Sequence, residues 1–402
     1  MIDTRTNLSL LFTCFAVFCL SLIPRTKSFL VPQPVGLSQK KIIELARNRF
    51  QKRGDDDIPM DGKVVVITGA AGGIGNELCR VVHSLGATVV ALDRDMNGLQ
   101  HLQKSLEGGE RFLPFRTHHE DLNSVAGVAN EIKSRFLNID VLINNAGLAY
   151  PQELTAGLPQ MISANGKDLA FTVNYLSHFL LTEILLDNLS NAHGRVVHMT
   201  STFHWKVDGS ELLPSPDGSD PIAFRSDPSE QCSKHVERSY ANTKLAQIWY
   251  SRSIQTPNCS SVCACPTWAA TGIAGEAGRD FLRTYAFPVS NCGPGITSAI
   301  NAILRTDAEL GDALNNGRSF VANSRILEYL GGKETLLTSH FTTNILGFRD
   351  ALADVLAVVL LIGQRYTYRD FIIQQTSPES FDDEDKRKAF YQWSRKEVQP
   401  WL

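Results

Sequence analysis

The chain has 402 residues, of which 43% are hydrophobic and 20% charged, a balance typical of a folded protein with a sizeable core. Its 39 Lys and Arg residues stand against 42 Asp and Glu residues, so no basic excess points to a nucleic-acid partner. The eight cysteines lack the paired CxxC spacing of a zinc site, and we expect buried free thiols and no metal.

Residues 8–24 read LSLLFTCFAVFCLSLIP and carry no charge. This run is longer than most signal-peptide cores and just short of a comfortable membrane span. Thr26 and Ser28 stand at −3 and −1 to a cleavage before Phe29. We therefore expect residues 1–28 to be a signal peptide or a membrane anchor that leads into the secretory membrane system, either luminal or anchored in the endoplasmic reticulum.

Residues 29–60 are expected to form a linker. The stretch TKS-FLVP at residues 26–32 resembles the junction of the bipartite presequences that target complex plastids in algae, which makes the plastid an alternative destination.

From Lys63 onward, β-branched apolar runs alternate with segments of helical period. The runs are apolar almost throughout, which favours a parallel sheet covered by helices on both faces. We predict one doubly wound α/β domain over residues 61–402, including a C-terminal extension. The predicted strands are residues 63–68, 87–93, 111–116, 139–143, 195–200 and 260–265, and the main predicted helices are 124–136, 167–188 and 239–254.

The periodicity vanishes over residues 202–238, which are rich in Pro, Gly, Asp and Ser and too polar for a core element. A loop of this length in a compact domain serves either as a lid over a large substrate or as a decoration. The apolar run 353–363 is too short to span a bilayer and favours a core or interface helix.

The sequence TGAAGGIG at residues 68–75 lies between a strand and a helix. Gly69 permits a tight turn, Gly73 lets the backbone approach a pyrophosphate, and Gly75 allows close packing of helix and strand. Ile74 lies in the first helical turn, whose free N–H groups attract phosphate. The motif predicts a dinucleotide-binding, Rossmann-type fold.

Asp93 ends the second predicted strand. A carboxylate at this place accepts hydrogen bonds from the adenosine ribose and repels a 2′-phosphate, which favours NAD over NADP. The neighbouring Arg94 leaves NADP open, because a guanidinium can hold that phosphate.

Tyr240 and Lys244 are spaced i and i+4 and therefore lie on one helix face. A phenol is a poor acid–base catalyst at neutral pH. A nearby ammonium favours the phenolate, and we expect it to lower the pKa of Tyr240 toward the working range.

Together these motifs resemble the short-chain dehydrogenase/reductase family over residues 61–305. The resemblance implies that Tyr240 is the general acid/base and that Lys244 binds the nicotinamide ribose. It also implies that Ser201 binds the substrate oxygen and that Asn174 holds a water in the proton relay. Further cofactor contacts are implied for the adenine end at Asp121 and Leu122, for the central portion at Asn144, Ala146 and Gly147, and for the nicotinamide end at Pro266 and Thr271.

The segment VNYLSHFLL at 173–181 and the tail with Ser377-Pro378-Glu379-Ser380, followed by Trp393-Ser394, resemble the retinol dehydrogenase-like branch. The family's Pro-Gly after the sixth strand is Pro266-Thr267 here, and because threonine resists a positive φ we do not carry over the family's backbone path at this point.

The resemblance implies an NAD(P)-dependent oxidoreductase that interconverts an alcohol with an aldehyde or ketone, on a lipophilic substrate. The alternatives are an NADPH-dependent carbonyl reductase of the same fold and a catalytically silent dinucleotide sensor. Members of the family commonly pair through long helices, so we expect a homodimer through residues 167–188 and 239–254, with an anchored monomer as the alternative. Membrane association would come from residues 8–24. Asn188 and Asn258 match the N-glycosylation pattern and would report a luminal location.

Overall fold

The computed structural model describes residues 40, 43–44, 47–48, 59–107, 109–149, 162–215, 219–224, 233–254, 256, 258–266, 293–314, 319–324, 368–380 and 383–402. The predictions for residues 1–28 and 353–363, for Thr271 and for most of the linker lie outside these residues.

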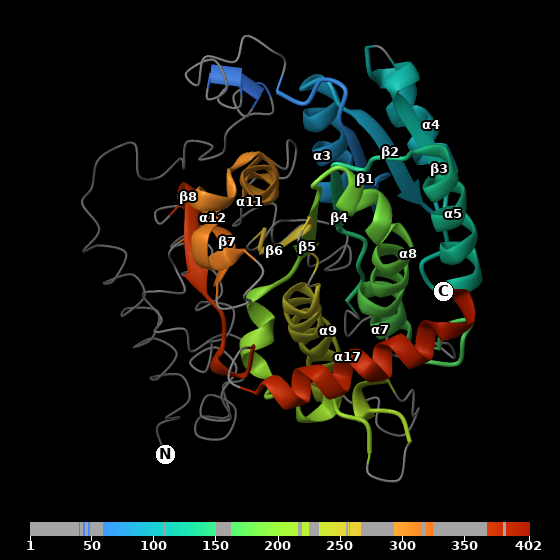
Figure 1. Ribbon diagram of the computed structural model, residues 1–402, viewed down its shortest axis with the longest axis vertical. Coiled ribbons are helices and arrows are strands. Elements are labelled where there is room, and N and C mark those ends of the chain that lie inside the picture. The colour runs from blue at the N-terminus through green and yellow to red at the C-terminus, as the bar shows by residue number, and fades with distance from the viewer. Residues whose placement is uncertain are drawn as a thin grey trace, which may run out of the picture. The chain divides into compact units, whose positions relative to one another are not determined.

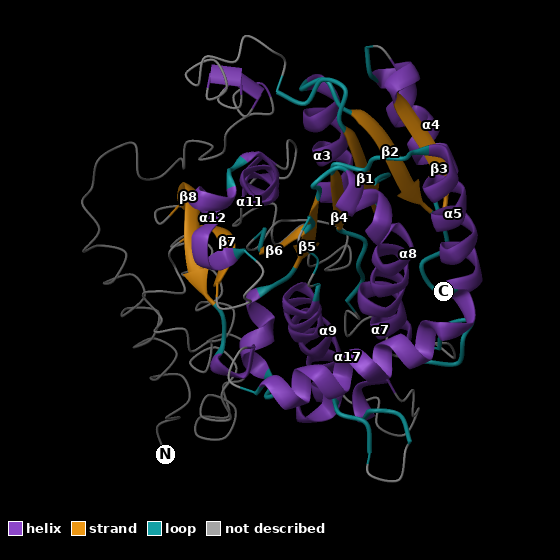
Figure 2. Ribbon diagram, in the orientation of Figure 1, coloured by secondary structure: helices purple, strands orange, loops and turns teal. Residues whose placement is uncertain are grey.

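The described chain contains one eight-stranded sheet with the order β3-β2-β1-β4-β5-β6-β7-β8 (Figures 1 and 2). All neighbours pair in parallel except β8, which is antiparallel to β7. The six predicted strands are confirmed with ends within two residues, whereas β7 and β8 were not predicted. The strands are β1 (Val64–Thr68), β2 (Thr88–Asp93), β3 (Phe112–Arg116), β4 (Val141–Asn144), β5 (Arg195–Met199), β6 (Ser260–Ala264), β7 (Ser319–Ser324) and β8 (Tyr368–Gln375).

Helices cover both faces of this sheet, as the apolar strands require. Val66 and Val90 face a core built with α5, α8 and α9, whereas Val65 and Val89 face a second core built with α3, α4 and α11. Alternate residues of each strand therefore enter opposite cores, and the doubly wound α/β prediction is confirmed. The helices are α3 (Gly73–Ser84), α4 (Met96–Ser105), α5 (Leu122–Arg135), α7 (Leu169–Phe171), α8 (Ser177–Asn191), α9 (Ser233–Ser253), α11 (Gly293–Leu304), α12 (Asp307–Leu310) and α17 (Glu384–Val398).

Short helical turns complete the described structure. A π-helical turn, Thr172–Leu176, joins α7 to α8, and its closing N–H, from Ser177, donates to the carbonyl of Thr172. Turns of 3-10 type lie at Gly109–Arg111, Thr202–Lys206, Ser210–Leu212, Ile222–Phe224, Gly311–Ala313, Pro378–Ser380 and Gln399–Trp401.

The strand order reverses between β1 and β4, so the chain leaves these two strands in opposite directions. In an open parallel sheet this reversal opens a crevice at the carboxyl ends of the strands, where ligands bind. The glycine motif follows β1, and Ala146 and Gly147 follow β4, so the predicted cofactor segments meet at this point.

The loop prediction for residues 202–238 was wrong in one respect. We expected the segment to be too polar for the core, but Val207, Leu212 and Ala223 are buried in the core beside α9. His204 is also buried, and its Nε2 accepts a hydrogen bond of 3.1 Å from the backbone N–H of Ser377. The described part of the insertion is therefore anchored, because its few apolar residues face inward.

Helix α17 crosses α9 and the start of the α7–α8 helix (Figure 1). Phe390 of α17 lies 5.0 Å from the ring of Tyr175 and 5.6 Å from that of Trp249, measured between centroids. The Tyr175 hydroxyl is 2.8 Å from that of Ser394. The helix faces that we expected to pair between subunits thus contribute these side chains to an internal core.

Among the described residues, Leu169–Asn191 is long and apolar enough to cross a membrane, but most of it is buried inside the protein. It serves here as a core helix. Four described cysteines are buried free thiols, as expected: Cys79, Cys259, Cys263 and Cys265.

Candidate dinucleotide and catalytic site

The glycine turn after β1 has the close packing that its spacing predicted. Gly69 has φ +65°, in the region where side chains are strained. A Cβ on Gly75 would lie 2.0 Å from the carbonyl oxygen of Gly69. Only glycine fits there, so α3 starts directly against the end of β1. Its first N–H groups, at Gly73, Ile74 and Gly75, lie at the crevice, which fits a dinucleotide pyrophosphate.

Thr68 and Asn145, to which no role was assigned from the sequence, hold this turn in place. The Thr68 hydroxyl accepts hydrogen bonds from the backbone N–H groups of Asn145, at 2.9 Å, and Ala146, at 2.8 Å. The Asn145 side-chain amide donates to the carbonyl of Thr68 at 2.9 Å. The loops after β1 and β4 are therefore tied together. Pairing of distant segments is invisible in one sequence, so no local signal assigned these roles.

Asp93 lies at the end of β2 beside the glycine turn. Its carboxylate accepts hydrogen bonds from the N–H of Ala71, at 3.0 Å, and the N–H of Asp95, at 2.9 Å. Arg94 is exposed next to it. The Asp93 carboxylate thus stabilises the glycine turn, a structural role separate from the ribose contact that we predicted.

The adenine-end and central residues divide into structural and crevice positions. Asp121 caps α5 by accepting from the N–H of Asn123, and the Leu122 side chain is buried. Asn144 is fully buried and donates to the Thr182 hydroxyl at 3.1 Å, so its side chain supports the core. Ala146 and Gly147 follow it at the crevice, where Gly147 is exposed.

Asn174 lies in the π-helical turn, and its side chain links the β4 loop to α9. Its Oδ1 accepts from the N–H of Leu148 at 2.8 Å, and its Nδ2 donates to the carbonyl of Leu148 at 2.9 Å. The same Nδ2 donates to the Thr243 hydroxyl at 3.2 Å. Turns of this type often occur at functional sites. Here the turn brings Asn174 between the dinucleotide loops and the helix that carries Tyr240.

Tyr240 and Ser201 meet through their side chains, since the phenol is hydrogen-bonded to the Ser201 hydroxyl. Ser201 follows β5 and also accepts from the N–H of Phe203. Burial, with the Cys265 thiol as a smaller contribution, raises the pKa of Tyr240, and the Ser201 bond only partly opposes this. This differs from the lowered pKa that we expected, because the loss of hydration outweighs the neighbouring groups.

Lys244 lies one helical turn after Tyr240, with its Nζ 5.3 Å from the centre of the Tyr240 ring. The Nζ donates to the carbonyl of Met199 at 2.8 Å and to Oε1 of Gln247 at 3.3 Å. Burial lowers the pKa of Lys244 to about 8. The ammonium is thus held between the end of β5 and its own helix, close enough to act on the phenol.

The structure therefore brings Asn174, Ser201, Tyr240 and Lys244 together at the carboxyl edge of the sheet, beside the glycine turn. A Cβ on Gly147 would lie 3.4 Å from Oδ1 of Asn174, which shows how close the two parts are. Pro266 follows β6 at the same edge, and the prediction for Thr271 lies outside the described residues. In the described part of the chain, no three His, Cys, Asp or Glu side chains are placed to hold a metal ion.

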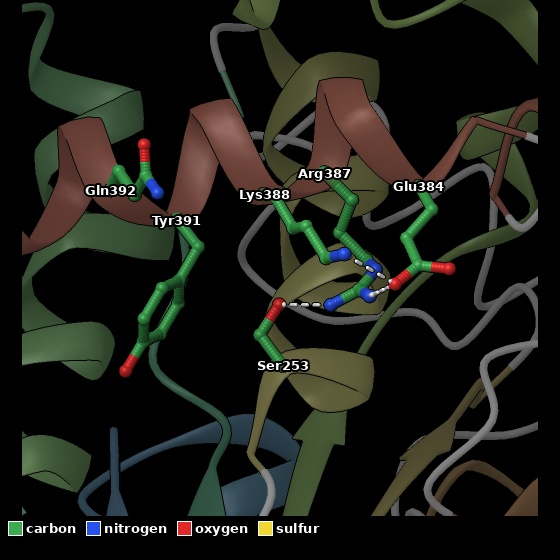
Figure 3. Close-up of a pocket in the computed structure, with 6 residues that line it drawn as sticks. All are labelled: Ser253, Glu384, Arg387, Lys388, Tyr391 and Gln392. Atoms are coloured by element: carbon green, nitrogen blue, oxygen red, sulfur yellow. Dashed lines mark hydrogen bonds and ion pairs between the residues drawn. The ribbon is translucent and has the colours of Figure 1, made fainter.

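A surface hollow of about 310 Å³ lies elsewhere, between the end of α9 and α17 (Figure 3). Arg387 reaches down from α17 to donate to the Ser253 hydroxyl at 2.9 Å, and Glu384 pairs with both Arg387 and Lys388. The charged groups of this hollow form ion pairs and hydrogen bonds with one another, and these contacts join α17 to α9. It contains none of the predicted catalytic residues.

Comparison with known proteins finds similarity over part of the chain. The family model for short chain dehydrogenases matches residues 63–207. Human retinol dehydrogenase 13 is 32% identical over 147 residues, which are 36% of this chain and 42% of that protein. L-fucose dehydrogenase from Mus musculus is 36% identical over 141 residues, 35% of this chain and 49% of that protein. The chain thus spans less than half the length of these relatives.

A crystal structure of an uncharacterised protein from Mycobacterium Paratuberculosis superposes with a TM-score of 0.54 at 19% identity. The match covers 86% of this chain and 96% of that one, and it shows the fold alone. The glycine turn, the Asn145-Ala146-Gly147 loop and the Tyr240–Lys244 pair are in place, and the chain is similar to the short chain dehydrogenases over residues 63–207 and to retinol dehydrogenase 13 over 36% of its length.

Proposed function

We propose that this protein is an NAD(P)-dependent oxidoreductase that interconverts an alcohol and a carbonyl compound, with Tyr240 as the general acid/base. The observation that carries the proposal is the Tyr240 phenol, bonded to the Ser201 hydroxyl and one helical turn from the Lys244 ammonium. These groups lie at the strand ends where the glycine turn offers its helix N-terminus to a dinucleotide.

In this mechanism the bound nicotinamide supplies or accepts the hydride. Because burial raises the pKa of Tyr240, the phenol keeps its proton at neutral pH and can donate it from Oη to a carbonyl oxygen. The Ser201 hydroxyl binds the same oxygen and orients it. In the reverse direction, the Lys244 ammonium stabilises the phenolate that takes the proton from the alcohol.

The test is a panel of alcohols, aldehydes and ketones, assayed with NAD, NADH, NADP and NADPH, comparing the natural protein with Tyr240→Phe. We expect Tyr240→Phe to lower kcat/KM about 10²–10⁴-fold, the usual contribution of a general acid/base. Tyr250→Phe is the matched control on the same helix, because the Tyr250 hydroxyl donates to Glu183, away from the site. Dinucleotide binding without turnover by the natural protein would instead favour a silent sensor.

For the cofactor we propose a preference for NAD, supported by the position of Asp93 at the end of β2. Asp93→Asn is the appropriate variant, since the amide oxygen can still accept from the N–H of Ala71 while the charge that repels a 2′-phosphate is removed. The ratio of Kd values for NADPH and NADH should fall at least tenfold. Tighter binding of NADPH by the natural protein would favour the NADPH-dependent reductase, with Arg94 on the phosphate.

For the substrate we propose a lipophilic alcohol or aldehyde, supported by the likeness to retinol dehydrogenases. The likeness to L-fucose dehydrogenase makes polar sugars the informative comparison in the panel. A kcat/KM higher for sugars than for long-chain or isoprenoid alcohols would contradict the lipophilic assignment.

For location we propose entry into the secretory membrane system through residues 8–24, with the plastid as the alternative. Glycosidase treatment of the expressed chain tests this at Asn258, which is exposed. Asn188 provides the control, because its buried amide donates to the carbonyls of Lys133 and Phe136 and is not accessible for modification. A mass shift removed by Asn258→Gln would place the domain in the lumen.

A further inference from the structure

Gln247 is a buried side chain on α9, one helical turn beyond Lys244, that no motif singled out. Its Oε1 accepts a hydrogen bond of 3.3 Å from Nζ of Lys244. Its Nε2 donates to the backbone carbonyl oxygen of Asn174 at 2.9 Å. A single amide therefore joins two residues of the proposed catalytic group that belong to different helices.

The carbonyl oxygen of Asn174 has a second protein donor. Nδ1 of His178 lies 3.0 Å from it and must carry the proton, because a carbonyl oxygen only accepts. Nε2 of His178 then accepts from the Thr68 hydroxyl at 2.9 Å. Gln247 and His178 therefore both donate to this oxygen.

The ammonium of Lys244 is equally constrained. Its Nζ has three donors, and two of them point to the carbonyl of Met199 and to Gln247. Gln247 thus bridges the Lys244 ammonium and the backbone of Asn174 directly.

We propose that Gln247 is a positioning residue for the Tyr240–Lys244 pair, whose amide fixes the Lys244 ammonium relative to the backbone of Asn174. This inference rests on the function proposed above. It predicts that Gln247 favours the charged form of Lys244, because its Oε1 accepts a stronger hydrogen bond from an ammonium than from a neutral amine.

Other titratable groups lie near Lys244, but their pKa values lie in other pH ranges. Burial lowers the pKa of His198 to about 3 and that of His178 well below its ordinary value, and it raises the pKa of Cys263 to about 12. Burial also raises the pKa of Tyr240. The groups that face Lys244 from its own helix and from the neighbouring elements are Tyr240, Cys263, Cys265, His178 and His198.

The experiment measures the pKa of Lys244 directly, by NMR titration of lysine labelled at Cε, with Lys244→Met used to assign the signal. Gln247→Met keeps the side-chain volume and removes both hydrogen bonds, so the pKa of Lys244 should fall by about one pH unit. Gln247→Glu places a carboxylate at the same distance, so the pKa should rise. Opposite shifts in two substitutions at one position are not expected from a merely structural role.

The activity readout is the pH profile of kcat/KM for the best substrate of the panel. We expect the alkaline limb of this profile to move to lower pH in Gln247→Met and to higher pH in Gln247→Glu, as the pKa of Lys244 does. In Gln247→Met, kcat should fall about 10-fold or more, while Kd for the dinucleotide changes less than threefold. Gln103→Met is the control, because the Gln103 amide bonds the carbonyls of Gly109 and Phe112 at a distant helix end. It should leave the pH profile unchanged.

The outcomes separate the two proposals. A Lys244 pKa that is the same in both Gln247 variants and the natural protein refutes the positioning role, even when the enzyme is active. A natural protein that turns over no member of the panel, while its Lys244 pKa still responds to both variants, refutes the proposed oxidoreductase and leaves the coupling of Gln247 to Lys244 supported.

Discussion

Replacement of Gly75 by alanine should separate dinucleotide binding from folding. The added Cβ would lie 2.0 Å from the carbonyl oxygen of Gly69 and 2.8 Å from Nδ2 of Asn145. Ordinary contact begins near 3.4 Å, so the start of α3 has to move away from the end of β1. The neighbouring atom is backbone, which cannot rotate aside as a flexible side chain would. Overpacking of this kind costs about 1–3 kcal/mol of stability.

The same displacement moves the N–H groups of the first helical turn relative to Asp93, which fixes the turn through the N–H of Ala71. We therefore expect Kd for NADH and NADPH to rise at least tenfold, since about 1.4 kcal/mol corresponds to one factor of ten. Isothermal titration calorimetry gives Kd, and urea unfolding gives the stability.

Gly127→Ala is the matched control for this experiment. Gly127 lies on the exposed side of α5, and a Cβ there meets nothing within 4 Å. Alanine should raise the free energy of unfolding by about 1 kcal/mol through its helix propensity and leave Kd unchanged. If Gly75→Ala binds both dinucleotides within threefold of the natural protein, the assignment of this turn as the pyrophosphate site is refuted.

Two further substitutions test the energetics of the site and of the C-terminal helix. The pKa of Lys244 is about 8 in the folded protein and near 10.5 in the unfolded chain. Between these two pH values the unfolded chain binds one more proton than the folded protein. The free energy of unfolding therefore rises by about 3 kcal/mol as the pH rises from 8 to 10.5. Lys244→Met should lose this rise, which urea unfolding at pH 7 and pH 11 measures in the variant and in the natural protein. An equal pH dependence of stability in the two proteins would contradict a buried Lys244 ammonium. Phe390→Ala should lower the free energy of unfolding by about 3–5 kcal/mol, because the ring is buried against Tyr175 and Trp249. Lys396 is exposed on the same helix, so Lys396→Ala should change the free energy of unfolding by less than about 0.5 kcal/mol. Similar losses of stability in Phe390→Ala and Lys396→Ala would contradict the packing of α17 against α9.

Tyr240, Lys244 and Gln247 show which features of the site could be predicted from the sequence and which could not. The spacing of Tyr240 and Lys244 correctly placed both on one face of a helix, because helical geometry is local. It did not predict that burial raises the pKa of the phenol, since burial depends on what other elements cover the helix. Gln247 was missed for the same reason: its two partners are a lysine one turn away and a carbonyl on another helix.

The amino-acid sequence by itself determined the six parallel strands and the glycine turn, because apolar periodicity and backbone freedom act over a few neighbouring residues. The tertiary structure alone decided the rest. It added β7 and β8 to the sheet, buried Leu212 of a polar insertion, and laid α17 over the faces of the long helices. These features arise from contacts between residues far apart in the chain, whose free energy depends on surfaces that exist only after the sheet and its helices have assembled.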